Sequence, residues 1–171
     1  PLPGRQSVLE VGPGAGEFLQ RLSARFDQVL ALDNSPHMLA QAGELVEEQR
    51  LSNVRLLEGD TSQLSHFANT FDCAVLNMVL HHTPSPATLF NDISFSLKVG
   101  GVLLVTELCL HDQNWTQQAC GDIWLGFTPE DLGEWACASG LEEGQSVYFA
   151  LRNGFQIQLR QFIKVAPTVS Q

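Results

Sequence analysis

The fold of this 171-residue chain is decided by the stretch Val8-Leu9-Glu10-Val11-Gly12-Pro13-Gly14-Ala15-Gly16. It opens as a short apolar run, which is typical of a buried strand, and closes with glycines at every second position. Such glycines permit a tight turn and let the backbone approach a ligand closely, because no side chain stands in the way. The stretch therefore predicts a strand, a ligand-binding loop and a helix that begins near Glu17.

The rest of the chain alternates between short apolar runs and amphipathic segments. The runs predict buried strands at Ser7–Val11, Val29–Asp33, Val54–Glu58, Phe71–Met78 and Gly101–Leu108. Between them, helices are expected to begin where a hydroxyl can cap free amides and proline fits the first helical position, at Ser35-Pro36, Ser85-Pro86 and Thr128-Pro129. Alternating strands and helices predict a parallel sheet with helices on both faces.

The last part of the chain follows a different pattern. Val147–Leu151 and Phe155–Ile163 flank Asn153-Gly154, a strong hairpin signal because both residues tolerate positive φ angles. An antiparallel hairpin is therefore expected at the end of the sheet. We expect one domain over residues 1–165 and a flexible tail over residues 166–171.

Composition narrows the range of functions. Nine Lys and Arg against nineteen Asp and Glu give a net charge of −10, so the surface repels nucleic acid phosphates and anionic lipid heads. No apolar run approaches the roughly 20 residues of a membrane helix. The four cysteines include no C-x-x-C pair, and no metal-ligand cluster stands out. We therefore expect a small-molecule partner, no nucleic acid, no membrane, no metal, and a cytoplasmic location.

Two details separate this loop from a dinucleotide-binding loop. The third glycine of a G-x-G-x-x-G motif would fall on Glu17, whereas this chain has Gly16. Glu10 stands two residues before Gly12, where its carboxylate would repel a pyrophosphate but would suit a ligand with an ammonium group. A nicotinamide-dependent enzyme thus remains an alternative, but the less favoured one.

Val8–Gly16 resembles motif I, E/D-x-G-x-G-x-G, of the class I S-adenosylmethionine (SAM)-dependent methyltransferases, and similar motifs follow over nearly the whole chain. The resemblance implies SAM as the cofactor and a doubly wound α/β fold. Its mostly parallel, seven-stranded sheet would have the order 3-2-1-4-5-7-6, with strand 7 antiparallel. Ile123–Leu132 is similar to a segment of methyltransferase domains fused behind winged-helix repressors of the arsenical-resistance type.

The resemblance also assigns a cofactor role to residues at the ends of the expected strands. Asp33 would accept hydrogen bonds from the ribose hydroxyls. Asp60 would lie near the adenine amino group, although an Asp in a turn is equally common. The full expected cofactor site comprises Glu10, Gly12, Pro13, Gly14, Gly16, Asp33, Asn34, Met38, Asp60, Thr61, Asn77 and Met78.

Methyl transfer from SAM requires no fixed catalytic residue, because the leaving group is already activated and the protein need only align the reactants. A general base matters only when the acceptor arrives protonated. The candidate bases are, in order, His82, Glu107 and His111. Because His81 and His82 are adjacent, they do not share a helix face, and we expect no metal site from these two alone.

Three further expectations concern the surroundings of the site. Trp115, Trp124 and Phe127 either wall a pocket for an apolar acceptor or pack in the core. The first strand begins close to Pro1, where most family members have a preceding helix, so we expect a fragment of a longer protein, with either a DNA-binding or a substrate-cap domain fused at its N-terminus. The alternative to catalysis is a module that senses SAM or S-adenosylhomocysteine for such a domain.

Overall fold

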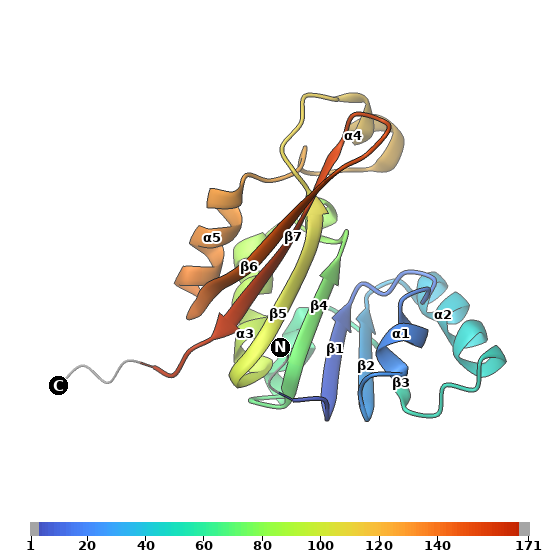
Figure 1. Ribbon diagram of the computed structural model, residues 1–171. Helices are drawn as coiled ribbons and strands as arrows, with labels where there is room; N and C mark the ends of the chain where they lie inside the picture. The colour runs from blue at the N-terminus through green and yellow to red at the C-terminus, as the bar shows by residue number, and fades with distance from the viewer. Residues whose placement is uncertain (1–3, 168–171) are drawn as a thin grey trace.

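The computed structural model describes residues 4–167, apart from the side chain of Trp115. Its centre is one sheet of order β3-β2-β1-β4-β5-β7-β6 (Figure 1). The strands are β1 (Ser7–Val11), β2 (Gln28–Asp33), β3 (Val54–Glu58), β4 (Phe71–Asn77), β5 (Leu97–Leu108), β6 (Leu141–Ala150) and β7 (Gln156–Lys164). Strands β1 to β5 pair in parallel, and β7 runs antiparallel to both β5 and β6. The expected fold class and strand order are confirmed.

Helices cover both faces of this sheet (Figure 1). They are α1 (Leu19–Ser23), α2 (Pro36–Glu48), α3 (Pro86–Ser96), α4 (Trp115–Cys120) and α5 (Pro129–Ala138), with 3-10 turns η1 (Thr61–His66) and η2 (Leu80–His82). Strand β1 is buried along its whole length, and its alternate residues pack into two hydrophobic cores, one on each face of the sheet. Leu9 packs with α3 and α5, whereas Val8 packs with α1 and α2. Among residues 4–167, no helix is long and apolar enough to cross a membrane.

Two of the three expected helix starts are confirmed in detail. Ser35 caps α2 by accepting a hydrogen bond from the amide of Met38. Thr128 opens α5 with a capping box, in which its hydroxyl accepts from the amide of Asp131 and the Asp131 carboxylate accepts from the amide of Thr128. Ser85 precedes α3 but forms no cap; its hydroxyl instead lies 2.8 Å from that of Thr88.

The terminal hairpin is present, but its strands and its turn differ from the expectation. Strand β6 begins at Leu141 rather than Val147, because the whole exposed segment pairs with β7. Of Asn153 and Gly154, Gly154 alone has a positive φ, of 88°. The amide of Leu151 donates to the carbonyl of Phe155, which closes a three-residue loop with a bulge in place of a two-residue turn.

Other boundaries shift for identifiable reasons. Helix α1 begins at Leu19, not near Glu17, because the amide of Gly16 first closes a turn on the carbonyl of Pro13. Strand β5 begins at Leu97 because that residue pairs with the start of β4, ahead of a register shift. Of the expected tail over 166–171, residues 168–171 lie outside the described part of the chain.

Candidate functional site

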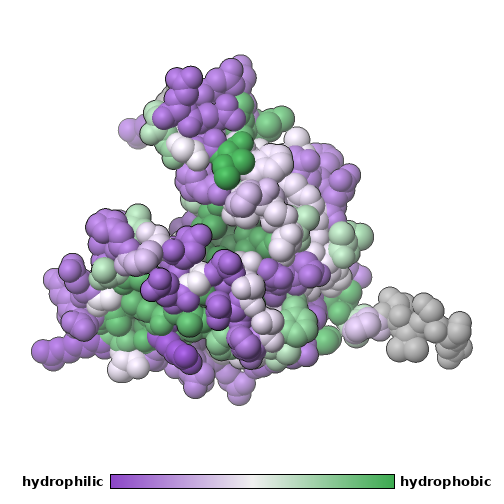
Figure 2. All heavy atoms as spheres, turned by 180° about the vertical axis from the view of Figure 1, so that it is seen from behind, coloured by the Kyte–Doolittle hydropathy of each residue, from purple (hydrophilic) through white to green (hydrophobic). Residues whose placement is uncertain are grey.

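A cavity of 1190 Å³ opens at the carboxyl ends of strands β1 to β4. Figure 2 shows the molecule hollowed on this side, with hydrophobic residues inside the hollow. The lining comes from the loop after β1, the ends of β2 and β4, the turn after β3 and the start of α3. Strands β1 and β4 are neighbours whose connections run to opposite sides, and this is the point where open α/β sheets bind ligands.

Two glycines of the first loop have different tasks. Gly12 lines the cavity with a φ of 68°, and a Cβ there would lie 2.7 Å from a methyl group of Val79. Gly16 has a φ of 86°, and its Cβ would lie 3.2 Å from the Cα of Ala42 on α2. Gly16 is not among the residues that line the cavity, and its lack of a side chain lets the loop pack against α2.

Glu10 is the most unusual polar group of the cavity lining. Its side chain ends in the cavity while the residue is only 2% exposed. Its Oε2 atom has no hydrogen-bond partner among the described residues. Burial raises the pKa of the Glu10 carboxyl to about 7, since water no longer solvates the charged form. A buried carboxylate without a partner favours a positively charged ligand in the cavity.

The structure brings the other expected cofactor residues to the same cavity. Asp33 lies at the end of β2, and one of its oxygens accepts from the amide of Ser35 while the side chain lines the cavity. Asp60 begins the turn after β3, where hydrogen bonds from Ser62 lower the pKa of its carboxyl. Eleven of the twelve expected residues line the cavity, all but Gly16; the others are Pro13, Gly14, Asn34, Met38, Thr61, Asn77 and Met78.

Met78 has a strained backbone at the cavity wall. Its φ is 57°, a left-handed conformation that non-glycine residues rarely adopt. The conformation is held by a 2.8 Å hydrogen bond from the Met78 amide to the carbonyl of Thr106 on β5. Strain of this kind collects at ligand sites, where the surrounding structure fixes it.

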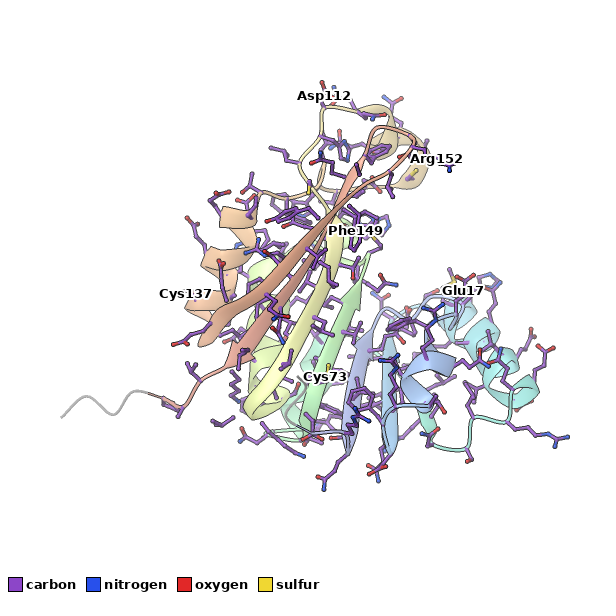
Figure 3. All side chains as sticks on the ribbon, viewed as in Figure 1. Glu17, Cys73, Asp112, Cys137, Phe149 and Arg152 are labelled. Atoms are coloured by element: carbon purple, nitrogen blue, oxygen red, sulfur yellow. The ribbon has the colours of Figure 1, made fainter. Side chains whose placement is uncertain are left out.

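The cavity is strongly acidic, which the sequence motifs revealed only in part. Among the described residues that line it, one Lys or Arg is present, Arg21 on α1. Five carboxylates also line the cavity: Glu10, Glu17, Asp33, Asp60 and Asp92. Glu17, labelled in Figure 3, lies just before α1. Asp92 accepts a 2.6 Å hydrogen bond from Thr61, and its position four residues after Thr88 on α3 could have indicated that both face the cavity.

The three candidate bases are separated by the structure. His82 lines the cavity, with half of its side chain exposed. His111 does not line it; the ring packs edge-on against Phe155 at 4.8 Å. Glu107 does not line it either and is fully buried, because its carboxylate accepts from the amide of Leu108 and contacts His81. Only His82 is therefore placed to meet a molecule in the cavity directly.

His81 turns away from the cavity and into a polar cluster. Its Nδ1 atom lies 2.6 Å from Oε1 of Glu107, and its Nε2 atom lies 3.8 Å from Oδ1 of Asp122. Burial by itself lowers the pKa of His81, but the hydrogen bond and the charges of Glu107 and Asp122 raise it above its usual value. Sequence reasoning missed Asp122, which lies some forty residues further along the chain.

The aromatic residues of the 111–127 segment pack together and do not wall the cavity. Phe127 is fully buried in the core, and its ring lies 5.8 Å from that of Trp124 and 5.5 Å from that of Trp135. The indole nitrogen of Trp124 donates to the carbonyl of Thr83. Phe127 thus follows the core alternative, whereas Trp124 is exposed and does not line the cavity; the side chain of Trp115 lies outside the description.

Comparison with known proteins agrees with this geometry. Residues 9–105, more than half of the chain, match the family described as "Methyltransferase domain". The chain is 38% identical over 107 residues to trans-aconitate 2-methyltransferase of Deinococcus radiodurans, covering 61% of this chain and 39% of that protein. It is 30% identical over 139 residues to 2-methyl-6-phytyl-1,4-hydroquinone methyltransferase 1 of Oryza sativa subsp. japonica, covering 80% and 41%. The chain thus spans about two fifths of the length of these relatives.

Solved structures agree on the fold. The crystal structure of a putative methyltransferase from Bacillus halodurans superposes with a TM-score of 0.84 at 16% identity, covering 96% of this chain and 95% of that one. Three observations support one family assignment: the sheet order, the acidic cavity at the ends of β1 and β4, and the family match. The chain belongs to the class I SAM-dependent methyltransferase family.

Proposed function

We propose that the chain transfers the methyl group of SAM to a small molecule. The observation that carries the proposal is the unpartnered Glu10 carboxyl in a cavity lined by five carboxylates and one arginine. SAM is cationic at its sulfonium and carries an ammonium group, so it compensates this charge, whereas the pyrophosphate of a dinucleotide would be repelled. The 1190 Å³ cavity exceeds the roughly 1,000 Å³ upper range for one small ligand, which leaves room for an acceptor.

The residues of the cavity divide the work of holding the cofactor. Glu10 would pair with the ammonium group, and Asp33 would accept from the ribose hydroxyls through the oxygen that Ser35 leaves free. Asp60 would lie near the adenine amino group. Asn77 and Met78, at the end of β4, would border the methionine part. When bound, SAM supplies an activated methyl group for an in-line displacement.

The chain's own task in the reaction is alignment and proton removal. Met78 and the loop at Gly12 fix the position of the backbone against the cofactor. For an acceptor that arrives protonated, we propose His82 as the base, since it is the candidate base that lines the cavity.

All four cysteines are free, which supports the expected reducing, cytoplasmic setting.

The acceptor class is open to a direct test. The relatives named above act, by their names, on trans-aconitate and on a phytyl hydroquinone. We would measure the release of S-adenosylhomocysteine with a panel of small carboxylic acids, quinols and amines. Turnover with at least one class is expected, and binding of SAM without any turnover would contradict the enzymatic proposal.

Binding is tested separately by calorimetry. SAM is expected to bind, and Asp33→Asn is expected to raise its Kd at least tenfold, about 1.4 kcal/mol, because a hydrogen-bonded charge is lost. Glu47→Gln removes an exposed carboxylate of α2 outside the cavity, and this control should leave the Kd unchanged. Tight binding of NAD without binding of SAM would overturn the assignment.

A further inference from the structure

Three side chains with metal-ligating atoms converge beside the cavity. His81 and His82 belong to η2, and Asp122 lies after α4 in the connection to α5. One ligating atom from each side chain lies within 4.8 Å of the other two. Oδ1 of Asp122 lies 3.8 Å from Nε2 of His81 and 3.8 Å from Nδ1 of His82. The cluster is separate from the residues expected to hold SAM, except that His82 also lines the cavity.

His81 is oriented as a metal ligand. Its Nδ1 atom lies 2.6 Å from the fully buried carboxylate of Glu107. In the neutral tautomer that carries its proton on Nδ1, His81 would donate that proton to Glu107 and direct the lone pair of Nε2 toward Asp122. Metal-bound histidines commonly donate their second ring nitrogen to a carboxylate in this way, which fixes the tautomer and the ring orientation.

Asp122 is a buried carboxylate in need of positive charge. Its side chain is 5% exposed, and it accepts no hydrogen bond from the described residues. The amides of Ile123 and Trp124 both donate to the carbonyl of His81, which anchors the Asp122 segment against η2. A buried acid held in place without a hydrogen-bond donor is costly unless a cation or a proton on a neighbour compensates it.

The distances fit a bridging ion better than a direct hydrogen bond. At 3.8 Å, each nitrogen-to-oxygen separation is too long for a hydrogen bond. Two bonds of about 2.0–2.2 Å that meet at a tetrahedral zinc-like ion span roughly 3.4 Å, so each separation would have to shorten by a few tenths of an ångström. The Nδ1 atom of His82 lies 3.4 Å from the carbonyl oxygen of Gly121 and would have to leave that contact to ligate an ion; half of the side chain is exposed, so the ring has room to move.

We propose that His81, His82 and Asp122 form a site for a divalent transition-metal ion such as Zn²⁺. Two nitrogens and one oxygen suit such an ion, and three protein ligands leave a coordination position open for water or an acceptor oxygen. Because His82 also lines the cavity, the ion would lie at the cavity wall, and a His82 that ligates the ion would no longer serve as the base proposed above. The proposal goes beyond methyl transfer, and it departs from the expectation of no metal, since the third ligand is supplied by the tertiary structure.

Metal binding is measured without any turnover. The chain, freed of metal with a chelator, would be titrated with ZnCl₂ by calorimetry, and with Co²⁺ by its visible absorption. One ion per chain is expected, together with the intense bands of four-coordinate Co²⁺. Asp122→Asn and His82→Ala should each weaken zinc binding at least tenfold. His37→Ala removes an exposed histidine of α2 outside the cluster and should leave the affinity unchanged.

The opposite outcomes are equally clear. Absence of zinc binding, or binding that neither Asp122→Asn nor His82→Ala weakens, would overturn the proposal and leave His81 as a protonated partner of both carboxylates. Circular dichroism of each variant would establish that it folds. Since SAM binding is measured separately on the same samples, failure of the metal site would be distinguishable from failure of the proposed function.

Discussion

At the scale of single residues, Glu10 combines a destabilising position with the proposed role of binding SAM. The carboxyl is buried at the end of β1 and has an oxygen without a partner among the described residues. The chain tolerates this because Val8, Leu9 and Val11 of β1 are apolar and pack in the cores on both faces of the sheet. A group that is unfavourable in the free protein and satisfied by a ligand is typical of a binding site.

The raised pKa of Glu10 predicts an effect of this position on the stability of the chain. The pKa of Glu10 is raised from 4.5 to about 7 in the folded chain, so the unfolded chain loses this proton first as the pH rises. The contribution of Glu10 is therefore fully present below pH 4.5 and is lost as the pH rises toward 7, by about 3 kcal/mol in the free energy of unfolding. Glu10→Gln should remove this dependence and be the more stable protein at pH 8.

Urea unfolding at pH 4.5 and pH 8 would measure how the free energy of unfolding depends on pH in the unsubstituted chain and in Glu10→Gln. Glu47→Gln, on the exposed side of α2, is the matched control. The control should keep the pH dependence of the unsubstituted chain. If Glu10→Gln shows the same pH dependence as the control, Glu10 is not the buried acid that the structure describes. The same variant should bind SAM more weakly, so stability and affinity are expected to change in opposite directions.

At the scale of elements, α5 shows how a local signal and tertiary packing combine. Its start is fixed locally by the reciprocal hydrogen bonds of Thr128 and Asp131. Its position is fixed by burial, since Leu132 and Ala136 join the core formed with α3 and the sheet. The helix lies away from the cavity, so changes to its cap should affect stability and leave the site intact.

Thr128→Ala is accordingly expected to lower the free energy of unfolding by about 1 kcal/mol, because an amide of the first turn loses its acceptor. Thr128→Ser keeps the hydroxyl and should remain within a few tenths of a kcal/mol of the unsubstituted chain. Urea denaturation of both variants, with calorimetry of SAM binding, would measure this. Equal stability of the two variants, or a weakened SAM affinity in the alanine variant alone, would contradict the assigned role.

At the scale of the whole molecule, the cavity depends on elements from distant parts of the chain. It is lined from Glu10 to Asp92, and the segment that anchors η2 comes from residues 121–124. A ligand that binds here contacts elements whose arrangement is lost on unfolding. Binding and global stability are therefore linked by mass action.

SAM at a hundred times its Kd is expected to add about 2.7 kcal/mol to the free energy of unfolding. For a chain of this length, that corresponds to a rise in Tm of about 5–10 °C. Scanning calorimetry with SAM, with S-adenosylhomocysteine and with NAD as the control would measure it. NAD should leave Tm unchanged, and a larger shift with NAD than with SAM would refute the cofactor assignment.

The sequence by itself determined the strands, the glycine loop and the residues at the strand ends. These are local properties: apolar runs bury themselves in a parallel sheet, and the carboxyl ends of parallel strands meet at one edge. For this reason the strand-end positions of Glu10 and Asp33 predicted one shared edge, whereas the cofactor roles of Asp33 and Asp60 came from the resemblance to the family. The strand order came from the resemblance to the family, and the structure confirmed it.

Only the tertiary structure decided which side chains meet when they are distant in sequence. It placed Gly16 against α2, and it buried Glu107 against His81. It also brought Asp122 beside two adjacent histidines that had given no reason to expect a metal. Spacing within one element predicts neighbours along that element, whereas contacts between elements depend on how the whole chain packs, and no local pattern encodes that packing.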